Sequence, residues 1–345
     1  MGTYFKQHDL ERLRSLRETL LGIEGRPSAD EAPRYWRDQR DIELYDQVFA
    51  ARIGWKWDAV LDEVELRHEL PRPTSVLDWA TGTGVAARRT LARLPDVKSV
   101  TLFDRDEAVL EFARRSVAEA FPEVHVTATT EAPVAQFDLM LASHVLDELE
   151  PDGVGALRNA ALRSGHVLLV EPGSKKTSRD LSALRDTLVD AFQVLAPCTH
   201  AKACGILTPD HKRDWCHLFA KPPAEVHTTG EWSEIHRELR IDLRSLPYSF
   251  VALRARSLGA PEPVQAGARM LQRARLQRGR ALLDLCDESG VREASLLQRT
   301  DKALFKDLKK STGVVRFFCD DGPTVQPLEI GGPQAPHSQN EVHGA

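Results

Sequence analysis

One stretch of the sequence decides the fold, Ser75-Val76-Leu77-Asp78-Trp79-Ala80-Thr81-Gly82-Thr83-Gly84. Its apolar first half predicts a short strand, its two glycines predict a tight turn, and the apolar spacing over 85–94 predicts a helix after the turn. A strand that runs through a glycine turn into a helix is typical of a doubly wound α/β sheet, in which ligands bind at the carboxyl ends of the strands. We therefore expect a binding site at this turn.

Outward from this stretch, strand and helix patterns alternate for about 120 residues. The predicted strands are 75–77, 100–103, 124–128, 137–142 and 166–170, and the predicted helices between them are 85–94, 107–120, 152–163 and 178–192. This alternation predicts a parallel sheet covered by helices on both faces. The expected core covers 71–195, and a returning strand near 248–258 completes it.

Four further regions surround this core. Residues 1–70 predict helices, because the apolar residues near their end fall on one helix face, Trp57, Val60, Leu61 and Val64. Residues 196–247 contain three cysteines and little periodicity. Residues 259–320 predict a β-rich module with a hairpin whose strands are 282–286 and 291–297. Residues 321–345 are polar and rich in Gly and Pro, so we expect a disordered tail there.

The composition of the 345 residues is that of an ordinary globular protein, with 42% hydrophobic and 28% charged residues, which excludes collagen-like and fully disordered chains. No apolar run reaches the roughly 18–20 residues that a membrane span needs. Residues 1–25 carry several acidic side chains and no apolar signal segment, so we expect a cytoplasmic protein. Five cysteines are too few for a disulfide-rich scaffold, and in a reducing cytoplasm clustered cysteines more often bind metal or act in catalysis.

The residues around the glycine turn favour S-adenosylmethionine as a cofactor. The turn lacks the Gly-Lys-Ser/Thr of a phosphate-binding loop, but Ala87 supplies the third small residue of a dinucleotide turn, so the glycines alone leave NAD open. Asp78 discriminates between NAD and S-adenosylmethionine. Its carboxylate repels the pyrophosphate of NAD, and it receives the amino group of the amino-acid tail of S-adenosylmethionine. Asp104 lies 22 residues beyond Gly82, where an acidic residue accepts hydrogen bonds from both ribose hydroxyls.

This stretch resembles motif I of the Rossmann-like methyltransferases, with Ala80 in the place of the first glycine of Asp-x-Gly-x-Gly-x-Gly. The resemblance places Ser143 and His144, which follow the fourth strand, at the methyl-transfer site, with His144 as a base or as polar lining. The Asn/Asp-Pro-Pro-Tyr/Phe tetrad that methylates exocyclic amines is not found there. The predicted cofactor-binding residues are Asp78, Ala80, Gly82, Gly84, Asp104 and Ser143, and no catalytic residue is assigned.

Three of the five cysteines, Cys198, Cys204 and Cys216, lie within 19 residues. Thiolates are soft ligands for iron–sulfur clusters and for zinc, so this clustering predicts a metal site. The C-x5-C-x11-C spacing matches no common zinc finger, and the fourth ligand is open among Cys286, Cys319, His200 and His217. Pro197-Cys198 also resembles the Pro-Cys nucleophile of RNA cytosine methyltransferases. That nucleophile follows the fourth strand, whereas Pro197 follows the fifth, so we favour a metal ligand.

These segments together resemble one family, the methyltransferase-like proteins of the mitochondrial small ribosomal subunit and their bacterial relatives (the Rsm-twenty-two, or methyltransferase-like-seventeen, family). The resemblance covers roughly residues 40–310 and rests on the glycine turn and on 142–149, 170–173, 196–204, 214–217, 249–250 and 283–286. It implies an α/β, Rossmann-like S-adenosylmethionine-dependent methyltransferase fold with N-terminal helices, a Cys-rich metal-binding insert and a small β-rich, OB-like C-terminal module.

The resemblance also implies a metal site and a partner. In the mitochondrial members four cysteines hold a [4Fe–4S] cluster, and the motifs carry this set over to Cys198, Cys204, Cys216 and Cys286. Cys319 is then spare, and the longer gap between the second and third ligands keeps zinc open. The implied partner is the small ribosomal subunit, on which the protein acts either as a methyltransferase of rRNA or ribosomal protein or as a non-catalytic assembly factor. Without transit-like features at the N-terminus, we expect a bacterial member.

The net charge of −5 hides an asymmetry along the chain. Residues 251–320 contain 14 Lys and Arg against 8 Asp and Glu, so the rest of the chain has a net charge of −11. A basic β-rich module suits contacts with RNA phosphates and a small OB-like barrel, whereas the alternative is a solvated Arg-rich helix over 269–280. We therefore expect this module to contact rRNA.

Overall fold

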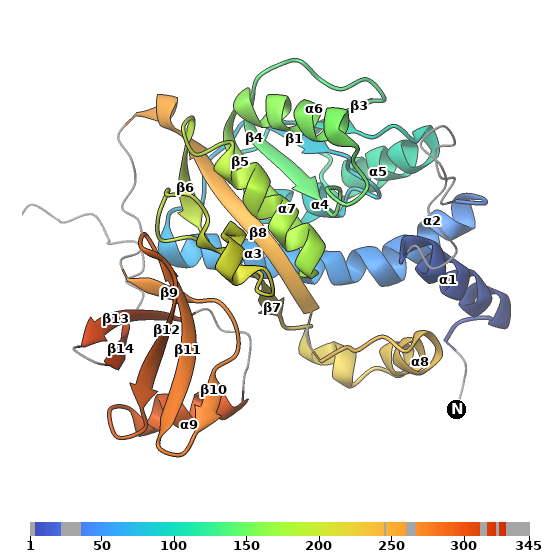
Figure 1. The fold of residues 1–345 in the computed structure, drawn as a ribbon. Coiled ribbons are helices and arrows are strands. Elements are labelled where there is room, and N and C mark those ends of the chain that lie inside the picture. Colours follow the sequence, from blue (N-terminus) through green and yellow to red (C-terminus); the bar gives the residue numbers. More distant parts are fainter. Residues whose placement is uncertain are drawn as a thin grey trace, which may run out of the picture.

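The computed structural model describes residues 4–21, 36–244, 246–259, 267–310, 316–321 and 324–328. Within these ranges the chain forms an α/β body around one large sheet, followed by a smaller antiparallel sheet (Figure 1). No helix in the described ranges has the length and apolar character that crossing a lipid bilayer requires.

The large sheet has eight strands, seven of them in the order β3-β2-β1-β4-β5-β8-β6, with β7 paired to β8. Its strands are β1 Ser75–Trp79, β2 Ser99–Phe103, β3 His125–Thr129, β4 Phe137–Ser143, β5 Ser164–Pro172, β6 Phe192–Ala196, β7 Leu218–Ala220 and β8 Leu246–Ala255. Strands β1 to β5 pair in parallel, whereas β8 runs antiparallel to both β5 and β6. The predicted parallel sheet with a returning strand is confirmed, and its strand order is that of the Rossmann-like methyltransferases.

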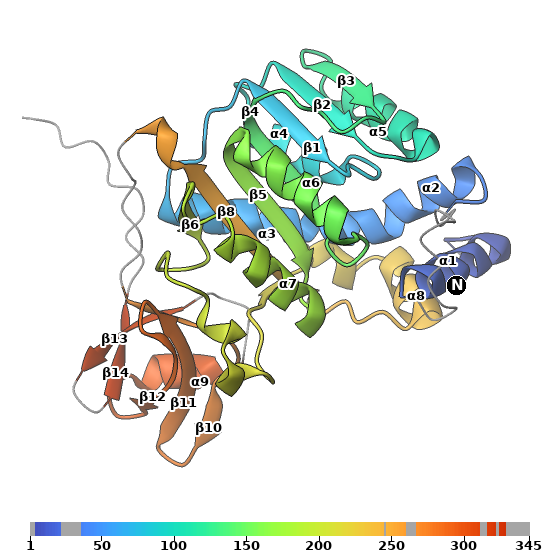
Figure 2. The ribbon, with the colours of Figure 1, turned by 45° about the horizontal axis from the view of Figure 1, so that its top comes forward.

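Helices cover both faces of this sheet (Figure 2). On one face lie α3 Ala51–Arg67, α4 Val85–Leu91 and α5 Glu107–Ala120, and on the other lie α6 Pro151–Leu162 and α7 Lys175–Asp186. Successive side chains of β4 enter opposite cores, Leu139 and Leu141 the first and Met140 and Ala142 the second. A central strand buried on both faces has a continuous apolar sequence, which is why 137–142 predicts a strand clearly.

The predicted helices of the N-terminal region are confirmed within the described residues. They are α1 Gln7–Leu20, α2 Gln39–Tyr45 and a π-helical turn, η1 Asp46–Ala50, which leads into α3. Helix α1 packs against α8 Gly230–Leu239, an element more than 200 residues later. Glu234 of α8 accepts hydrogen bonds from the backbone N–H groups of Tyr4 and Phe5.

The predicted irregular insert lies between β6 and β8. It contains β7, α8 and three 3-10 turns, η2 Gly205–Leu207, η3 Pro209–His211 and η4 Ala224–His227. The predicted helix over 178–192 is wrong at its end, because α7 stops at Asp186 and Phe192 begins β6. The apolar periodicity continues through the loop between them, so the sequence shows no break there.

The smaller sheet contains β9 Ala268–Met270, β10 Arg275–Gln277, β11 Arg280–Asp287, β12 Gly290–Leu297, β13 Phe317–Asp321 and β14 Thr324–Leu328, and α9 Lys302–Lys310 packs on it. Strands β11 and β12 form the predicted hairpin, and 269–280 forms strands rather than a helix. The tail predicted from 321 is wrong at its start, since β14 pairs with β13. Residues 260–266 and 329–345 lie outside the described ranges. Strand β12 also lies against β14, so the sheet curls; an OB-like barrel stays a prediction.

Candidate functional site

The turn after β1 is built from left-handed backbone. Ala80, Gly82 and Gly84 have φ angles of 56°, 53° and 81°. A Cβ added at Gly82 would meet nothing within 4 Å, so the turn is open on that side. A Cβ added at Gly84 would come within 3.2 Å of Ala113 and Val117, so this glycine lets α4 approach α5. One glycine therefore serves packing, and the other leaves room for a ligand.

Asp104 follows β2 and faces the turn. Its Oδ2 accepts a hydrogen bond from the N–H of Gly82 at 2.9 Å, and its Oδ1 accepts one from the N–H of Asp106 at 3.1 Å. Burial raises the pKa of this carboxyl. Each carboxylate oxygen has two lone pairs, so both oxygens keep the capacity to accept a further bond from a ribose hydroxyl.

Asp78 lies beneath the turn and is fully buried. Its Oδ2 accepts hydrogen bonds from Thr81 Oγ1 at 2.7 Å and from the N–H of Ala87 at 3.1 Å, which fixes the turn to the start of α4. Its Oδ1 has no partner among the described residues, and burial raises its pKa to about 7. The sequence argument assigns Asp78 to the amino group of a cofactor, and these contacts add a second role in support of the turn.

The end of β4 is fastened to α3. Trp57 Nε1 donates to Ser143 Oγ at 2.9 Å, and Lys56 Nζ lies 3.2 Å from His144 Nε2. The backbone of His144 is left-handed, with a φ of 55°, and its N–H donates to the carbonyl of Val170 at 2.8 Å. Non-glycine residues in this conformation are strained and gather at functional sites. Sequence reasoning missed Lys56 and Trp57, because only the packing of α3 on the sheet brings them to β4.

Burial shifts the pKa values of three side chains at the end of β4. It lowers the pKa of Lys56 to about 7, lowers that of His144 well below its usual value and raises that of Glu171 to about 8. Glu171 Oε1 accepts hydrogen bonds from the N–H groups of Val145 and Leu146 at 3.0 and 3.2 Å, whereas its Oε2 has no partner among the described residues. Titratable groups whose pKa values are strongly shifted by burial are typical of functional sites.

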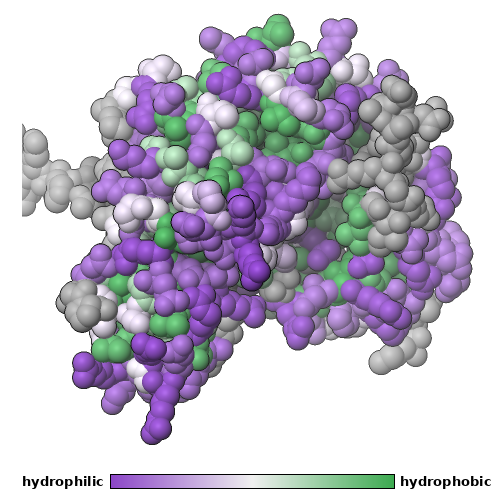
Figure 3. All heavy atoms as spheres, viewed as in Figure 1, coloured by the Kyte–Doolittle hydropathy of each residue, from purple (hydrophilic) through white to green (hydrophobic). Residues whose placement is uncertain are grey.

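Parallel pairing brings these residues to one edge of the sheet. Trp79 lies opposite Phe103 of β2 and Ala142 of β4, so the residues that follow the three strands share the carboxyl edge. All six predicted cofactor-binding residues lie at this edge, namely Asp78, Ala80, Gly82, Gly84, Asp104 and Ser143. Figure 3 shows that the surface is hollowed between α7 and α2, where α3 passes beneath. This is the place at which doubly wound folds bind ligands, and cofactor binding there stays a prediction.

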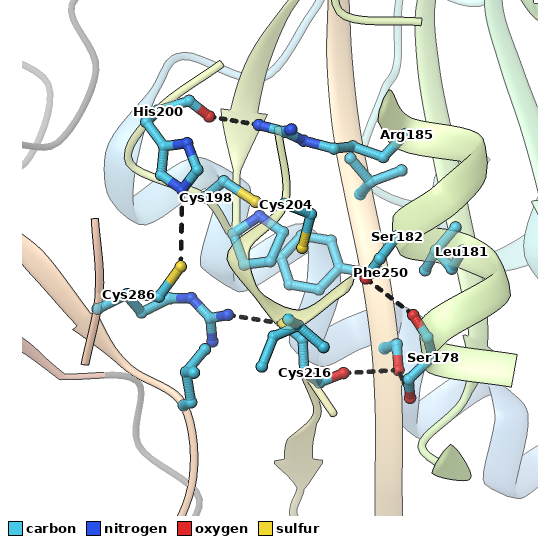
Figure 4. A pocket seen from close by; sticks show the side chains of 16 residues that line it. Ser178, Leu181, Ser182, Arg185, Cys198, His200, Cys204, Cys216, Phe250 and Cys286 are labelled. Carbon is cyan, nitrogen blue, oxygen red and sulfur yellow. Dashed lines mark hydrogen bonds between the residues drawn. The ribbon is translucent and has the colours of Figure 1, made fainter. Parts of the chain in front are cut away.

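A second site lies where the insert meets the smaller sheet. Cys198, Cys204 and Cys216 of the insert and Cys286 of β11 line one pocket (Figure 4). All five cysteines are free thiols. Cys319 of β13 is not part of this pocket, and its Sγ faces the carbonyl oxygen of Gln326 at 3.9 Å. The structure thus brings together the four cysteines that the family resemblance names and sets the fifth apart.

The two candidate histidines differ in position. His200 lines the pocket, and its Nε2 lies 3.6 Å from Cys286 Sγ. His217 does not line it, since its ring stacks on Trp215 at a centroid distance of 5.0 Å. The candidates for a fourth ligand therefore reduce to Cys286 and His200.

Arginine side chains surround the sulfurs. Arg269 of β9 is 2% exposed, and its Nη2 donates to Cys216 Sγ at 2.7 Å. Burial alone lowers its pKa, but the sulfurs of Cys216 and Cys198 raise it overall. Arg185 pairs with Asp186, whereas no described carboxylate forms an ion pair with Arg269. A buried, unpaired guanidinium requires negative charge nearby, which the thiolates of a metal site would supply.

The thiols are not gathered around one point. Within the described ranges, no group of three or more His, Cys, Asp or Glu side chains is placed to hold a single metal ion. Burial raises the pKa of Cys204 to about 11 and that of Cys286 to about 12, so these groups are neutral thiols until a metal displaces their protons. The donor set fits a thiolate-bound metal, and the metal itself stays a prediction.

Comparison with known proteins gives one family and several distant structures. A family model described as mitochondrial small ribosomal subunit Rsm22 matches residues 49–313. The chain is similar to magnesium protoporphyrin IX methyltransferase (ChlM) of Synechocystis PCC 6803 with bound SAM, at 10% identity and a TM-score of 0.38 over 74% of this chain and 100% of that chain. It is also similar to the plantazolicin methyltransferase BpumL in complex with SAH, at 12% identity and a TM-score of 0.37 over 72% of this chain and 99% of that chain. No curated protein matches the chain. The distant structures add nothing to the strand order described above.

Proposed function

Since the chain belongs to the family of the mitochondrial small ribosomal subunit Rsm22, we propose that it acts on the small ribosomal subunit as an S-adenosylmethionine-dependent methyltransferase of rRNA or ribosomal protein. The observation that carries the proposal is the geometry of the cofactor edge. Gly82 leaves space for a ligand, Asp104 holds the N–H of Gly82, and Asp78 keeps one carboxylate oxygen unpaired. A buried carboxylate oxygen without a hydrogen-bond partner destabilises the folded chain, and such destabilising groups are typical of binding sites.

Each residue of the edge has a role in this proposal. Gly82 would let the cofactor approach the backbone, Asp104 would accept hydrogen bonds from its ribose hydroxyls, and Asp78 Oδ1 would accept one from its amino group. Bound S-adenosylmethionine would supply an electrophilic methyl group, which would pass from its positively charged sulfur to a nucleophile of the acceptor and leave S-adenosylhomocysteine. Ser143 and His144 border the side from which the acceptor enters.

Calorimetry with S-adenosylmethionine tests the proposal. The unmutated chain is expected to bind, and Asp104→Asn is expected to weaken binding at least about tenfold, because the amide loses the charge-assisted bonds to the ribose. Asp138→Asn is the control, since this carboxylate is bound to Thr74 at the opposite, amino edge of the sheet. A folded, unmutated chain that gives no binding heat with the cofactor would contradict the proposal.

A non-catalytic assembly factor is the second candidate function. It is favoured by the residues at the end of β4, Ser143-His144-Val145-Leu146, which stand where amine methyltransferases carry Asn/Asp-Pro-Pro-Tyr/Phe. Purified small subunits and a cofactor with a tritium-labelled methyl group separate the two functions. Label transfer to rRNA or protein establishes the enzyme, whereas cosedimentation with the subunits and cofactor binding without label transfer establish the assembly factor.

The cysteine pocket is part of the same proposal. Cys198, Cys204, Cys216 and Cys286 would hold a [4Fe–4S] cluster, with zinc as the alternative metal and His200 as the alternative fourth ligand. The buried, unpaired guanidinium of Arg269 supports a net negative centre. A four-iron cluster spreads its cysteine ligands farther apart than one zinc ion does, which agrees with thiols that are not gathered for a single ion. Such a centre would tie the insert to the smaller sheet.

The smaller sheet is proposed to face RNA. Several of its arginines are neutralised within the sheet, as in the ion pairs Arg275–Asp284, Arg292–Asp320 and Arg316–Asp307. Seven exposed cations form no ion pair with a described residue, namely Arg273, Arg278, Arg280, Arg299, Lys302, Lys306 and Lys309. Figure 3 shows a hydrophilic surface over this part of the molecule. RNA affinity should fall with increasing salt, and the slope should flatten in Lys302→Glu, because fewer counterions are released.

A further inference from the structure

Helix α3 presents two cations, Arg52 and Lys56, one turn apart in the part of the fold that leads to the cofactor edge. Residues four apart lie on the same side of a helix, and Lys56 reaches His144 at the end of β4. The hollow between α7 and α2 in Figure 3 opens above this helix. Lys56 therefore reaches the edge of the sheet that carries the predicted cofactor turn, and Arg52 lies one helical turn before it on α3.

Neither cation has an anionic partner among the described residues. Lys56 is 9% exposed, and its only described hydrogen-bond partner is the ring of His144, whose low pKa leaves it uncharged. The Nε of Arg52 is buried without an acceptor. Burial is the first cause that lowers the pKa of Lys56 to about 7 and that of Arg52 to about 10. Other arginines of this region are paired, as in Arg88–Asp46.

Two carboxyl groups attract these cations from a distance, but neither forms an ion pair with them. Glu171 attracts Lys56, but burial raises the pKa of Glu171 to about 8, and its Oε1 accepts the N–H groups of Val145 and Leu146 while its Oε2 has no partner among the described residues. Asp242 attracts Arg52, but both of its oxygens bind Arg244. Arg17 of α1 adds further positive charge beside Arg52. Within the part of the chain that the structure describes, no carboxylate therefore neutralises Arg52 or Lys56 by direct contact.

We propose that Arg52 and Lys56 form an oxyanion-binding subsite beside the end of β4, at the edge of the sheet that carries the cofactor turn. A buried cation without a partner destabilises the folded chain unless an anion binds it. The subsite fits either the carboxylate of the cofactor's amino-acid tail or a phosphate of an RNA acceptor, and which of the two it receives rests on the proposed function. The chemistry is the same for both, because a lysine and an arginine together bind an oxyanion through charge-assisted N–H bonds.

Binding measurements on Lys56→Met and Arg52→Met test the subsite. The ligands are S-adenosylhomocysteine, its decarboxylated analogue and inorganic pyrophosphate. Methionine keeps the length and apolar stem of each side chain and removes its charge, and Arg52→Met guards against a failure of Lys56→Met to fold. The matched control is Lys98→Met, which removes one positive charge from an exposed position at the amino end of β2.

Two results support the subsite and identify its ligand. If it receives the cofactor carboxylate, both variants bind S-adenosylhomocysteine about tenfold more weakly, and the decarboxylated analogue binds the unmutated chain and both variants alike. If it receives a phosphate, both variants bind S-adenosylhomocysteine and its decarboxylated analogue as tightly as the unmutated chain does. In that case pyrophosphate raises the melting temperature of the unmutated chain and of Lys98→Met, but not that of the two α3 variants.

One result overturns the subsite. This result is that the α3 variants and Lys98→Met have the same affinity for S-adenosylhomocysteine and the same rise in melting temperature with pyrophosphate. A chain that binds no S-adenosylhomocysteine at all contradicts the proposed function instead. In that case the pyrophosphate measurement still decides the subsite, so the two failures are distinguishable.

Discussion

Ala80 occupies a backbone conformation that suits glycine, with a φ of 56°. A Cβ in the left-handed region clashes with the neighbouring carbonyl at a cost of roughly 1–2 kcal/mol. We expect Ala80→Gly to raise the free energy of unfolding by about 1 kcal/mol, because part of this gain is lost to the greater freedom of glycine in the unfolded chain. Urea denaturation measures it.

Ala87→Gly is the control for this prediction. Ala87 lies in α4 with no exposed surface, so glycine there removes a buried methyl group and weakens the helix. It should lower the free energy of unfolding by about 1 kcal/mol or more. A loss of stability in Ala80→Gly of the size seen in the control would show that the methyl group of Ala80 packs usefully.

Asp78 makes the stability of the protein depend on pH. Its pKa in the folded chain is about 7, because burial disfavours the charged form, against a usual value of 3.8. Between these two values the folded state holds a proton that the unfolded state has released, so stability falls as the pH rises from about 4 to about 7. Asp78→Asn cannot ionise and should lose less stability between pH 5 and pH 8 than the unmutated chain does. Denaturation at several pH values measures this.

Glu171 should cause the pH dependence that remains in Asp78→Asn, and Asp138→Asn is the control variant. Glu171, with a pKa of about 8, is buried in the same way and should keep part of the slope in Asp78→Asn. Asp138→Asn should leave the slope between pH 5 and pH 8 unchanged, since hydrogen bonds from Thr74 and Ser75 outweigh burial and lower the pKa of Asp138. Equal slopes in Asp78→Asn and the unmutated chain would mean that Asp78 is ionised in the folded state across this range.

At the scale of elements, α3 and the end of β4 form one unit. Trp57 has no exposed surface, and its Nε1 depends on Ser143 for a hydrogen bond. Ser143→Ala leaves this donor buried and unpaired, which should cost about 1–3 kcal/mol. In a double-mutant cycle with Trp57→Phe, the two losses should not add, and the coupling free energy should be about 1 kcal/mol. Additive losses would show that the bond contributes nothing.

The sequence predicts the central strands and the glycine turn well. It does not predict features that depend on contacts between elements far apart in the sequence. The central strands are continuous apolar runs, so their pattern is local. The glycine turn predicts Asp78 and Gly82, and the spacing to the end of the second strand predicts Asp104. The contact between Lys56 and His144 joins residues 88 apart and has no local pattern. Strand β6 is missed for a related reason, since Phe192–Ala196 is stabilised by pairing with β8, which lies about 60 residues later.

At the scale of the whole molecule, the insert and the smaller sheet meet at the cysteine pocket. An added Cβ at Gly205 would come within 2.9 Å of the backbone of Val291, so the insert and β12 are in contact there. The guanidinium of Arg67 lies 4.5 Å from the ring centroid of Phe317, which joins α3 to β13. Clustering predicts three of the cysteines as ligands, and the family resemblance adds Cys286, which lies more than 60 residues later. The fold brings all four to the lining of one pocket.

The fourth cysteine therefore provides the sharpest test of this arrangement, because two cysteines of the same sheet differ in position. Cys286 lines the pocket and Cys319 does not. If the pocket holds a metal centre, Cys286→Ser should lose most of the iron or zinc of anaerobically purified protein and lower its melting temperature by several degrees, since metal binding stabilises the folded state. Cys319→Ser should keep both metal content and melting temperature. Equal metal content in the two variants would exclude Cys286 as a ligand and leave His200, and metal-free unmutated protein would exclude the centre.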